Sequence, residues 1–244
     1  GARRLPLRRE QPQLRHALQR TRDGPTSRPA TQPIPSGVVA LRYVRPEMLN
    51  VLIALHAQSP WNALGRWQGQ ADPPLSDLGV AQARRAAQIF GGVDAIVSSD
   101  LERASATARI LAEEMGIGPV LTDAGFRERH AGEFQGLTRD EIEARWPGHL
   151  EQGIRPPGWE ADHAVLARVL DAMDRLLAEA VAGDVLVVAH GGVIYSLEGH
   201  LGAPHERIAN LGGRWFHHDR GGWRLGERVQ LSPADVTIEN QDIL

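Results

Sequence analysis

From residue 50 onward, short apolar runs alternate with longer stretches that carry apolar residues at helical spacing. The apolar runs are strand-sized, and polar or glycine-containing loops follow them. This alternation is typical of parallel strands in one sheet, with the intervening helices packed on its two faces. It predicts a three-layer α/β/α sandwich with a mostly parallel central sheet. The expected strands are residues 50–55, 93–97 and 184–189, and the expected helices are 79–90, 101–115, 137–146, 161–181 and 193–201.

Local signals indicate where several of these elements begin and end. Thr138, followed three residues later by Glu141, forms a capping-box pattern that satisfies free backbone N–H groups at a helix start. Asp100 is placed to cap the helix that follows it. Residues 214–218 and 223–230 have the composition of strands, and we expect both at the edge of the sheet. Such an edge could pair with a second copy of the chain, so a homodimer is compatible with the sequence.

Charge divides the chain into two regions. Residues 1–47 have a balance of +7 from ten arginines and three acids, whereas the remaining residues have a balance of −10. Pro, Gln and Thr are frequent in residues 1–37 and no apolar period is sustained there, which is typical of disorder. We therefore expect a basic, Pro- and Arg-rich disordered extension over 1–47 and a folded domain over 48–244.

The basic extension has two possible interpretations. A positively charged arm can bind nucleic acid or a membrane surface. The simpler interpretation is a non-essential extension that precedes a natural start at Met48, because the first convincing strand follows directly. For the folded domain we expect no nucleic acid and no membrane as partner.

Composition excludes several kinds of chemistry. The chain has no cysteine, so disulfides, thiol nucleophiles and Cys-ligated zinc are excluded. All 27 basic residues are arginine, which excludes Schiff-base lysines and a P-loop lysine. The longest apolar runs, 51–55 and 185–189, are far shorter than a membrane span. No apolar stretch of a signal peptide accompanies the N-terminal arginines, so we expect a cytoplasmic location.

Two histidines follow directly after expected central strands. His56 ends the strand at 50–55, and His190 ends the strand at 184–189 and precedes a Gly-Gly turn. In open α/β sheets, ligands bind beyond the carboxyl ends of the strands. A single strand-end histidine is more often a structural hydrogen-bonding residue. Two of them, each after a central apolar strand, favour a functional site.

Further polar residues lie near these histidines in the expected topology. Arg103 falls in the first turn of a helix, where an isolated cation opposes the helix dipole. A surface salt bridge would explain it, but an anion clamp beside the histidines is the stronger interpretation. Glu128 lies in a short charged stretch and, taken alone, would be a solvated loop residue. The loop after the first strand holds Asn62, Arg66, Gln68 and Asp72.

Four stretches, in the same order along the chain, resemble the motifs of the histidine phosphatase superfamily, which includes cofactor-dependent phosphoglycerate mutases. Four ordered motifs are very unlikely to arise by chance, and the resemblance covers roughly residues 50–230. It implies a phosphoglycerate mutase-like version of the predicted sandwich. The stretches are 56–83, 98–108, 127–138 and 189–192.

The resemblance assigns a role to each of these residues. His56 would attack phosphorus through a neutral ring nitrogen and form a phosphohistidine. Glu128 would protonate the leaving oxygen and then deprotonate water. Arg103 and a protonated His190 would hold the equatorial phosphoryl oxygens. The remaining phosphate- and substrate-binding residues would be Asn62, Arg66, Ser59 and Gly191.

No metal and no cofactor are implied, and the expected partner is a small-molecule phosphomonoester. A zinc site built from His56, His190 and a carboxylate is the rival interpretation. The sequence contains neither a helical His-x-x-x-His pair nor an acidic cluster that would support a zinc site.

The chain departs from the family pattern at the residue before the expected nucleophile. That pattern is Arg-His-Gly, commonly with Ala in third place, whereas this chain has Leu55-His56-Ala57. Leucine cannot make the bidentate contacts of a guanidinium, and losing one comparable transition-state donor costs about 10²–10³ in rate. The chain could be a weak phosphatase, a chain altered at this position, a binding domain without activity, or an enzyme with a relocated arginine. The candidates for relocation are Arg66, Arg42 and Arg45.

Hydrolysis and mutase chemistry would use the same pocket. Mutases of the family carry a longer insertion before the acid/base glutamate, and here only 25 residues separate Arg103 from Glu128, which favours a phosphomonoester hydrolase. Residues 127–130 resemble the mutase pattern, so phosphoglycerate mutase-type transfer stays an alternative. A catalytically impaired, phosphate-binding pseudo-phosphatase is the alternative from another class. Residues 66–70 and 98–103 resemble glucosyl-phosphoglycerate phosphatases, so we expect a sugar or glycerate phosphate as substrate.

Overall fold

The computed structural model describes residues 48–179 and 183–232. The predicted disordered extension over 1–47 lies outside the described residues, as does the last part of the predicted domain, residues 233–244. None of the helices in the described part of the chain is long and apolar enough to cross a membrane.

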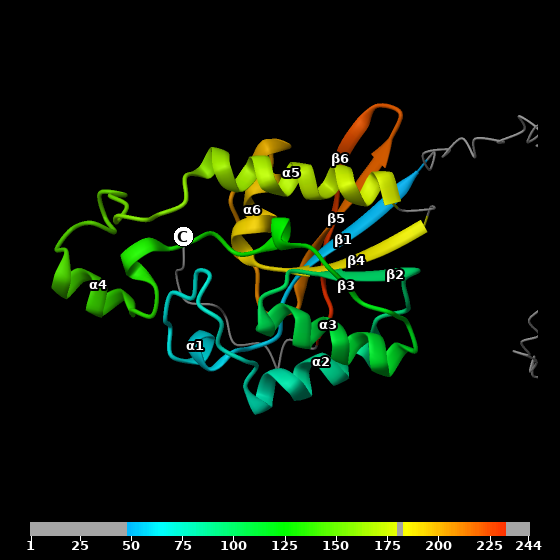
Figure 1. The fold of residues 1–244 in the computed structure, drawn as a ribbon, viewed down its shortest axis with the longest axis horizontal. Coiled ribbons are helices and arrows are strands. Elements are labelled where there is room, and N and C mark those ends of the chain that lie inside the picture. The colour runs from blue at the N-terminus through cyan, green and yellow to red at the C-terminus, as the bar shows by residue number, and fades with distance from the viewer. Residues whose placement is uncertain (1–47, 180–182, 233–244) are drawn as a thin grey trace, which may run out of the picture. The chain divides into compact units, whose positions relative to one another are not determined.

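A six-stranded sheet lies at the centre of the domain, with the strand order β3-β2-β4-β1-β5-β6 (Figure 1). The first four strands in this order are parallel. β5 runs antiparallel to β1, and β6 runs antiparallel to β5. The sheet is thus mostly parallel, as the sequence predicts. Its strands are β1 (Leu49–Leu55), β2 (Ala95–Ser98), β3 (Leu121–Thr122), β4 (Gly183–Ala189), β5 (Gly212–Asp219) and β6 (Gly222–Gln230).

Helices cover both faces of this sheet, which confirms the three-layer prediction (Figure 1). The α-helices are α1 (Pro60–Ala63), α2 (Asp77–Ile89), α3 (Glu102–Met115), α4 (Arg139–Arg145), α5 (Asp162–Glu179) and α6 (Gly191–His200). Two short 3₁₀ helices are η1 (Ala124–Phe126) and η2 (Gly132–Phe134). Alternation along β1 separates the two faces. Val51 and Ile53 pack in the apolar cluster of α5 and α6, whereas Leu52 packs in that of α2 and α3.

The predicted elements are present, and their described boundaries differ from the predicted ones by at most two residues. The capping box of Thr138 and Glu141 is confirmed at the start of α4. The prediction of an edge position for 214–218 is wrong, because β5 lies between β1 and β6. The second edge is β3, a two-residue exposed strand that is too short to show a period.

The predicted cap of α3 is also wrong. Leu101 occupies the N-cap position, and the Asp100 carboxylate instead accepts two hydrogen bonds from Arg127, at 2.7 and 2.5 Å. A distant loop supplies the missing acceptor, because Asp72 Oδ1 accepts the Glu102 N–H at 2.6 Å. The start of α3 is therefore fastened to the loop that follows β1.

A third apolar cluster joins that loop to the segment before α5. Trp67 packs edge-to-face against Phe134 of η2, with ring centroids 5.7 Å apart, and against Trp159 at 5.8 Å. Backbone hydrogen bonds reinforce the contact, since the Trp67 N–H donates to Leu137 O and the Gly136 N–H donates to Trp67 O. The loops that carry the residues around His56 and Glu128 are thus held together by their own small core.

Gly79 provides a test of this packing. A Cβ on Gly79 would lie 2.0 Å from the backbone oxygen of Gln58, which cannot move freely. We expect Gly79→Ala to lower the free energy of unfolding by about 1–3 kcal/mol, the usual cost of overpacking, although alanine favours helices. The measurement is urea unfolding followed by circular dichroism.

The matched control is Gly199→Ala in α6, where an added Cβ meets nothing within 4 Å. Only the helix propensity then changes, so the free energy of unfolding of this variant should rise by up to about 1 kcal/mol. A gain of stability in both variants would contradict the close contact at Gly79.

Candidate active site

Neighbouring parallel strands place His56 and His190 side by side. Leu55 of β1 lies opposite Ala189 of β4, and the His56 N–H donates to Ala189 O at 3.1 Å. The two imidazole rings meet edge-to-face with their centroids 5.2 Å apart. Both residues are buried, with 2% and 0% of their surface exposed. The carboxyl end of the sheet therefore holds a pair of buried imidazoles.

Hydrogen bonds select the tautomer of His56. Its Nδ1 lies 2.6 Å from the carbonyl oxygen of Ala57, which can only accept, so we assign the ring proton to Nδ1. Nε2 then has a free lone pair, and it accepts the N–H of Arg103 Nε at 3.1 Å. Burial, followed by the charge of Arg103, lowers the pKa of His56 to about 3. The ring is therefore neutral near pH 7, and its nucleophilic lone pair is on Nε2.

Arg103 is a fully buried cation without a salt bridge among the described residues. Its Nη1 and Nη2 donate to the carbonyl oxygens of Ala71 and Gly69, both at 2.8 Å. Burial lowers the pKa of Arg103 to about 10, while Glu128 and Asp72 act in the opposite direction. The surface salt bridge that would have explained this arginine is excluded. A buried cation held by neutral carbonyls is suited to binding an anion.

His190 differs from His56 in its hydrogen bonding. Neither of its ring nitrogens has a hydrogen-bond partner among residues 48–179 and 183–232. Burial lowers its pKa well below the usual value, and the charges of Arg103, His56 and Arg168 act in the same direction. The protonated His190 that the sequence analysis expects belongs to the state with a phosphoryl group bound, and for that state it stays a prediction. Only a nearby negative charge, such as that of a phosphoryl group, would favour the protonated form.

Glu128 lies beside the start of α6, next to His190. Its carboxylate accepts the N–H of Arg129 at 2.6 Å and the N–H of Gly192 at 3.2 Å. A Cβ on Gly192 would lie 2.1 Å from Glu128 Oε1, so a side chain there would displace the carboxylate. Gly192 is a site residue that the sequence analysis did not single out, although the Gly-Gly turn after His190 was the available signal.

Asn62 and Ser59 bond to each other in the loop after β1. They form the capping box of α1, in which Asn62 Oδ1 accepts the Ser59 N–H at 3.0 Å. Ser59 Oγ also donates to Gln68 Oε1 at 2.7 Å. Both residues are buried. Gly191 is a further residue that the sequence analysis expects to bind substrate. It is the first residue of α6.

Arg66 is engaged away from His56. Its guanidinium forks onto the Glu141 carboxylate at 2.7 and 3.2 Å, and it also donates to the carbonyl of Gly136. These contacts fasten the loop after β1 to α4, so the idea that Arg66 replaces an arginine at position 55 is wrong. The other candidates for that replacement, Arg42 and Arg45, lie outside the described residues.

Leu55 belongs to the apolar core. It is 3% exposed and packs in the cluster that β1 and β4 form with α5 and α6, which includes Val165 and Val169. Its side chain thus fills space beneath the helices, directly before the His56 backbone.

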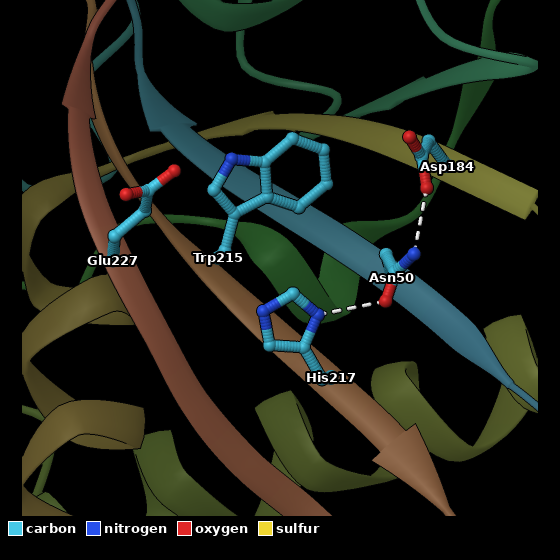
Figure 2. Close-up of a pocket in the computed structure, with 5 residues that line it drawn as sticks. All are labelled: Asn50, Asp184, Trp215, His217 and Glu227. Carbon is cyan, nitrogen blue, oxygen red and sulfur yellow. Dashed lines mark hydrogen bonds between the residues drawn. The ribbon is translucent and has the colours of Figure 1, made fainter.

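A separate hollow lies at the other end of the strands (Figure 2). Asn50 and Asp184 stand near the starts of β1 and β4, about 20 Å along the strands from the histidines. The polar side chains bond one another, since Asn50 donates to Asp184 at 2.8 Å and His217 Nδ1 lies 2.7 Å from Asn50 Oδ1. This hollow does not belong to the histidine pocket. It is lined by Asn50, Asp184, Trp215, His217 and Glu227.

The pocket at the carboxyl end combines four chemical functions in a small space. It holds a neutral nucleophilic nitrogen on His56, a buried cation on Arg103, unpartnered ring nitrogens on His190 and an oriented carboxylate on Glu128. Positioning and charge stabilisation are what phosphoryl transfer requires of a protein. No three His, Asp or Glu side chains of the described residues lie close enough together to hold a metal ion.

Comparison with known proteins gives consistent matches. Residues 51–228 match the model of the histidine phosphatase superfamily (branch 1). The chain is 32% identical over 209 residues to a 2,3-bisphosphoglycerate-dependent phosphoglycerate mutase of Methylobacterium sp. (strain 4-46), covering 80% of this chain and 96% of the relative. It is 40% identical over 162 residues to a glucosyl-3-phosphoglycerate phosphatase of Mycobacterium tuberculosis, covering 60% and 72% of the two chains.

Solved structures agree with this match. A mycobacterial glucosyl-3-phosphoglycerate phosphatase in complex with inorganic phosphate aligns with a TM-score of 0.64 and 32% sequence identity. The alignment covers 77% of this chain and the whole of that one. The likeness therefore extends over most of the described residues.

The two buried neutral histidines predict a loss of stability in mild acid. Unfolded histidine binds a proton near pH 6.5, whereas folded His56 binds it only near pH 3. Between these values the unfolded state binds more protons, so stability falls as the pH decreases. At pH 5 His56 alone should cost about 2 kcal/mol relative to pH 7.5, and His190 acts in the same direction. Urea unfolding at the two pH values measures the difference.

His56→Gln should remove the contribution of His56, about 2 kcal/mol between the two pH values. The exposed His163, substituted in the same way, serves as the control and should leave the pH dependence unchanged. Equal pH dependence in the unaltered protein and in His56→Gln would show that burial does not lower the pKa of His56.

Proposed function

Because this chain belongs to the histidine phosphatase superfamily, we propose that it hydrolyses a small phosphomonoester through a phosphohistidine on His56. The observation that carries the proposal is the pair of contacts on the His56 ring. Ala57 O holds Nδ1 at 2.6 Å, and Arg103 Nε lies 3.1 Å from Nε2. The nucleophilic lone pair and the anion-binding cation therefore meet at one point.

The geometry supports a reaction in two displacements. In the first, His56 Nε2 forms a bond to phosphorus while the bond to the ester oxygen breaks, and Glu128 donates a proton to that oxygen. In the second, water attacks phosphorus, Glu128 takes a proton from it, and the N–P bond breaks to release phosphate. Arg103 and His190 would stabilise the charge on the transferred oxygens in both steps.

Hydrolysis is favoured over mutase transfer by the short connection before Glu128. Residues 116–127 contain only β3 and η1, so no further helix stands between α3 and the acid/base residue. Mutase transfer stays the alternative, because relatives of both kinds match the chain. Their names point to a glycerate phosphate or a sugar-linked glycerate as the substrate class. Such metabolites are consistent with a cytoplasmic location.

A phosphate-binding protein without turnover is the alternative from another class. It is motivated by Leu55, which cannot donate to a phosphoryl oxygen. Arg66 does not compensate, since its guanidinium is bound to Glu141. The pocket otherwise retains a nucleophile, a cation and a carboxylate, which supports slow hydrolysis instead of pure binding.

His56→Ala tests the nucleophile. We expect the unaltered protein to hydrolyse p-nitrophenyl phosphate slowly and to acquire an acid-labile, base-stable phosphoryl group on His56, which mass spectrometry of a quenched reaction would locate. The variant should lose both signals. Turnover that persists in His56→Ala would exclude the phosphohistidine route, and a protein that shows neither signal before mutation would be a binding protein.

Leu55→Arg tests the missing donor. If the new guanidinium reaches the phosphoryl oxygens, kcat/KM should rise by about 10²–10³, the value of one transition-state donor. Leu55→Met, which keeps an apolar side chain of similar volume, is the control and should leave kcat/KM within about twofold. Thermal unfolding of both variants separates a catalytic effect from loss of the core. An unchanged rate in a folded Leu55→Arg protein would show that this donor is not limiting.

A further inference from the structure

The guanidinium of Arg168, on α5, is bound to the segment that carries Glu128. Nη1 donates to the carbonyl oxygens of Gly125 and Arg127, at 2.8 and 2.6 Å. Nη2 donates to the carbonyl oxygen of Glu128 itself, at 3.1 Å. Three carbonyls within four consecutive residues thus converge on one cation.

Glu160 holds the same guanidinium from its other side. Its two carboxylate oxygens accept from Arg168 Nε at 2.7 Å and from Nη2 at 3.0 Å. The two side chains are only 21% and 17% exposed, so solvent screens this pair less than a surface ion pair. Glu160 Oε2 also accepts the N–H of His130 at 3.0 Å. Arg168 and Glu160 together therefore hold the backbone on both sides of Glu128.

Glu128 needs such support because no helix or strand contains it. It lies between η1 and η2, and regular backbone hydrogen bonds do not fix its position. Its carboxylate accepts the N–H of Gly192, at the start of α6, at 3.2 Å. A shift of the Glu128 backbone would therefore move the carboxylate relative to His56 and His190.

We propose that Arg168 is a positioning residue for proton transfer by Glu128. This inference rests on the proposed function, in which Glu128 protonates the leaving oxygen. Arg168 itself would touch neither substrate nor phosphorus. Its effect would pass through the three carbonyls that it holds.

The leaving group distinguishes positioning from general stabilisation. A general acid matters most when the leaving oxygen is strongly basic, as in an alkyl phosphate, and little for 2,4-dinitrophenyl phosphate. Arg168→Met removes the hydrogen bonds and keeps much of the volume. It should lower kcat/KM for 3-phosphoglycerate by about 10²-fold, the cost of displacing a catalytic group by about 1 Å. For 2,4-dinitrophenyl phosphate the loss should stay below about fivefold.

Arg175 supplies the matched control. It lies two turns further along α5 and forks onto the Asp123 carboxylate with two contacts of 2.8 Å. It thus binds the same loop through a carboxylate, without a hydrogen bond to the backbone of Glu128. Arg175→Met should change kcat/KM for both esters by the same small factor. Thermal unfolding is recorded for each variant.

Glu128→Gln shows the pattern expected when the general acid itself is removed. Its kcat/KM should fall strongly for 3-phosphoglycerate and only slightly for 2,4-dinitrophenyl phosphate. Combining it with Arg168→Met should lower kcat/KM for 3-phosphoglycerate no further than Glu128→Gln alone, because both act on one proton transfer. If Arg168→Met does not fold, Arg168→Lys takes its place in the same comparison. Lysine keeps the positive charge but lacks the planar guanidinium that binds several carbonyl oxygens at once.

The outcomes separate the two proposals. Equal losses on both esters, or additive losses in the double variant, would overturn the role of Arg168 and leave the proposed function intact. Absence of turnover of both esters by the unaltered protein would overturn the proposed function, and the role of Arg168 with it.

Discussion

The pairing of β1 with β4 is the constraint on which the pocket depends. Since Leu55 lies opposite Ala189, the two following residues leave the sheet at the same place and their imidazoles come within 5.2 Å. A shift of one residue in this register would turn every side chain of β1 to the other face. The same pairing brings both rings under the loops, and the resulting burial keeps them neutral. The neutral state of the His56 ring is thus a consequence of the core.

Burial has the opposite consequence for Arg103. Its guanidinium is buried, and among the described residues carbonyl oxygens and the His56 ring accept its hydrogen bonds. A buried cation of this kind is unfavourable unless its remaining N–H groups find acceptors. The folded loop after β1 supplies part of the compensation. Occupation of the pocket by an oxyanion would supply the rest, so the cost of burying Arg103 becomes selectivity for anions.

The sequence predicts what local patterns determine, and it fails where distant segments supply the partner. Strand and helix periods located the layers, and two strand-end histidines located the pocket. The cap of α3 was mispredicted because its acceptor, Asp72, is thirty positions away in the chain. The partner of Arg66 was missed for the same reason, since six elements, from α2 to η2, lie between it and Glu141 in the chain. Arg168 gave no signal at all, because a single arginine on an amphipathic helix resembles any solvated residue.

In the proposed reaction, phosphoryl binding has to meet a charge balance to which Leu55 contributes nothing. A phosphoryl dianion carries two negative charges, and Arg103 offers one positive charge against them. The second would come from a proton on His190, whose pKa burial and Arg103 hold low. An arginine in place of Leu55 would oppose that proton further, whereas leucine does not. If His190 gains its proton when the anion binds, as the proposed reaction requires, anion binding and protonation of His190 would be linked in this chain.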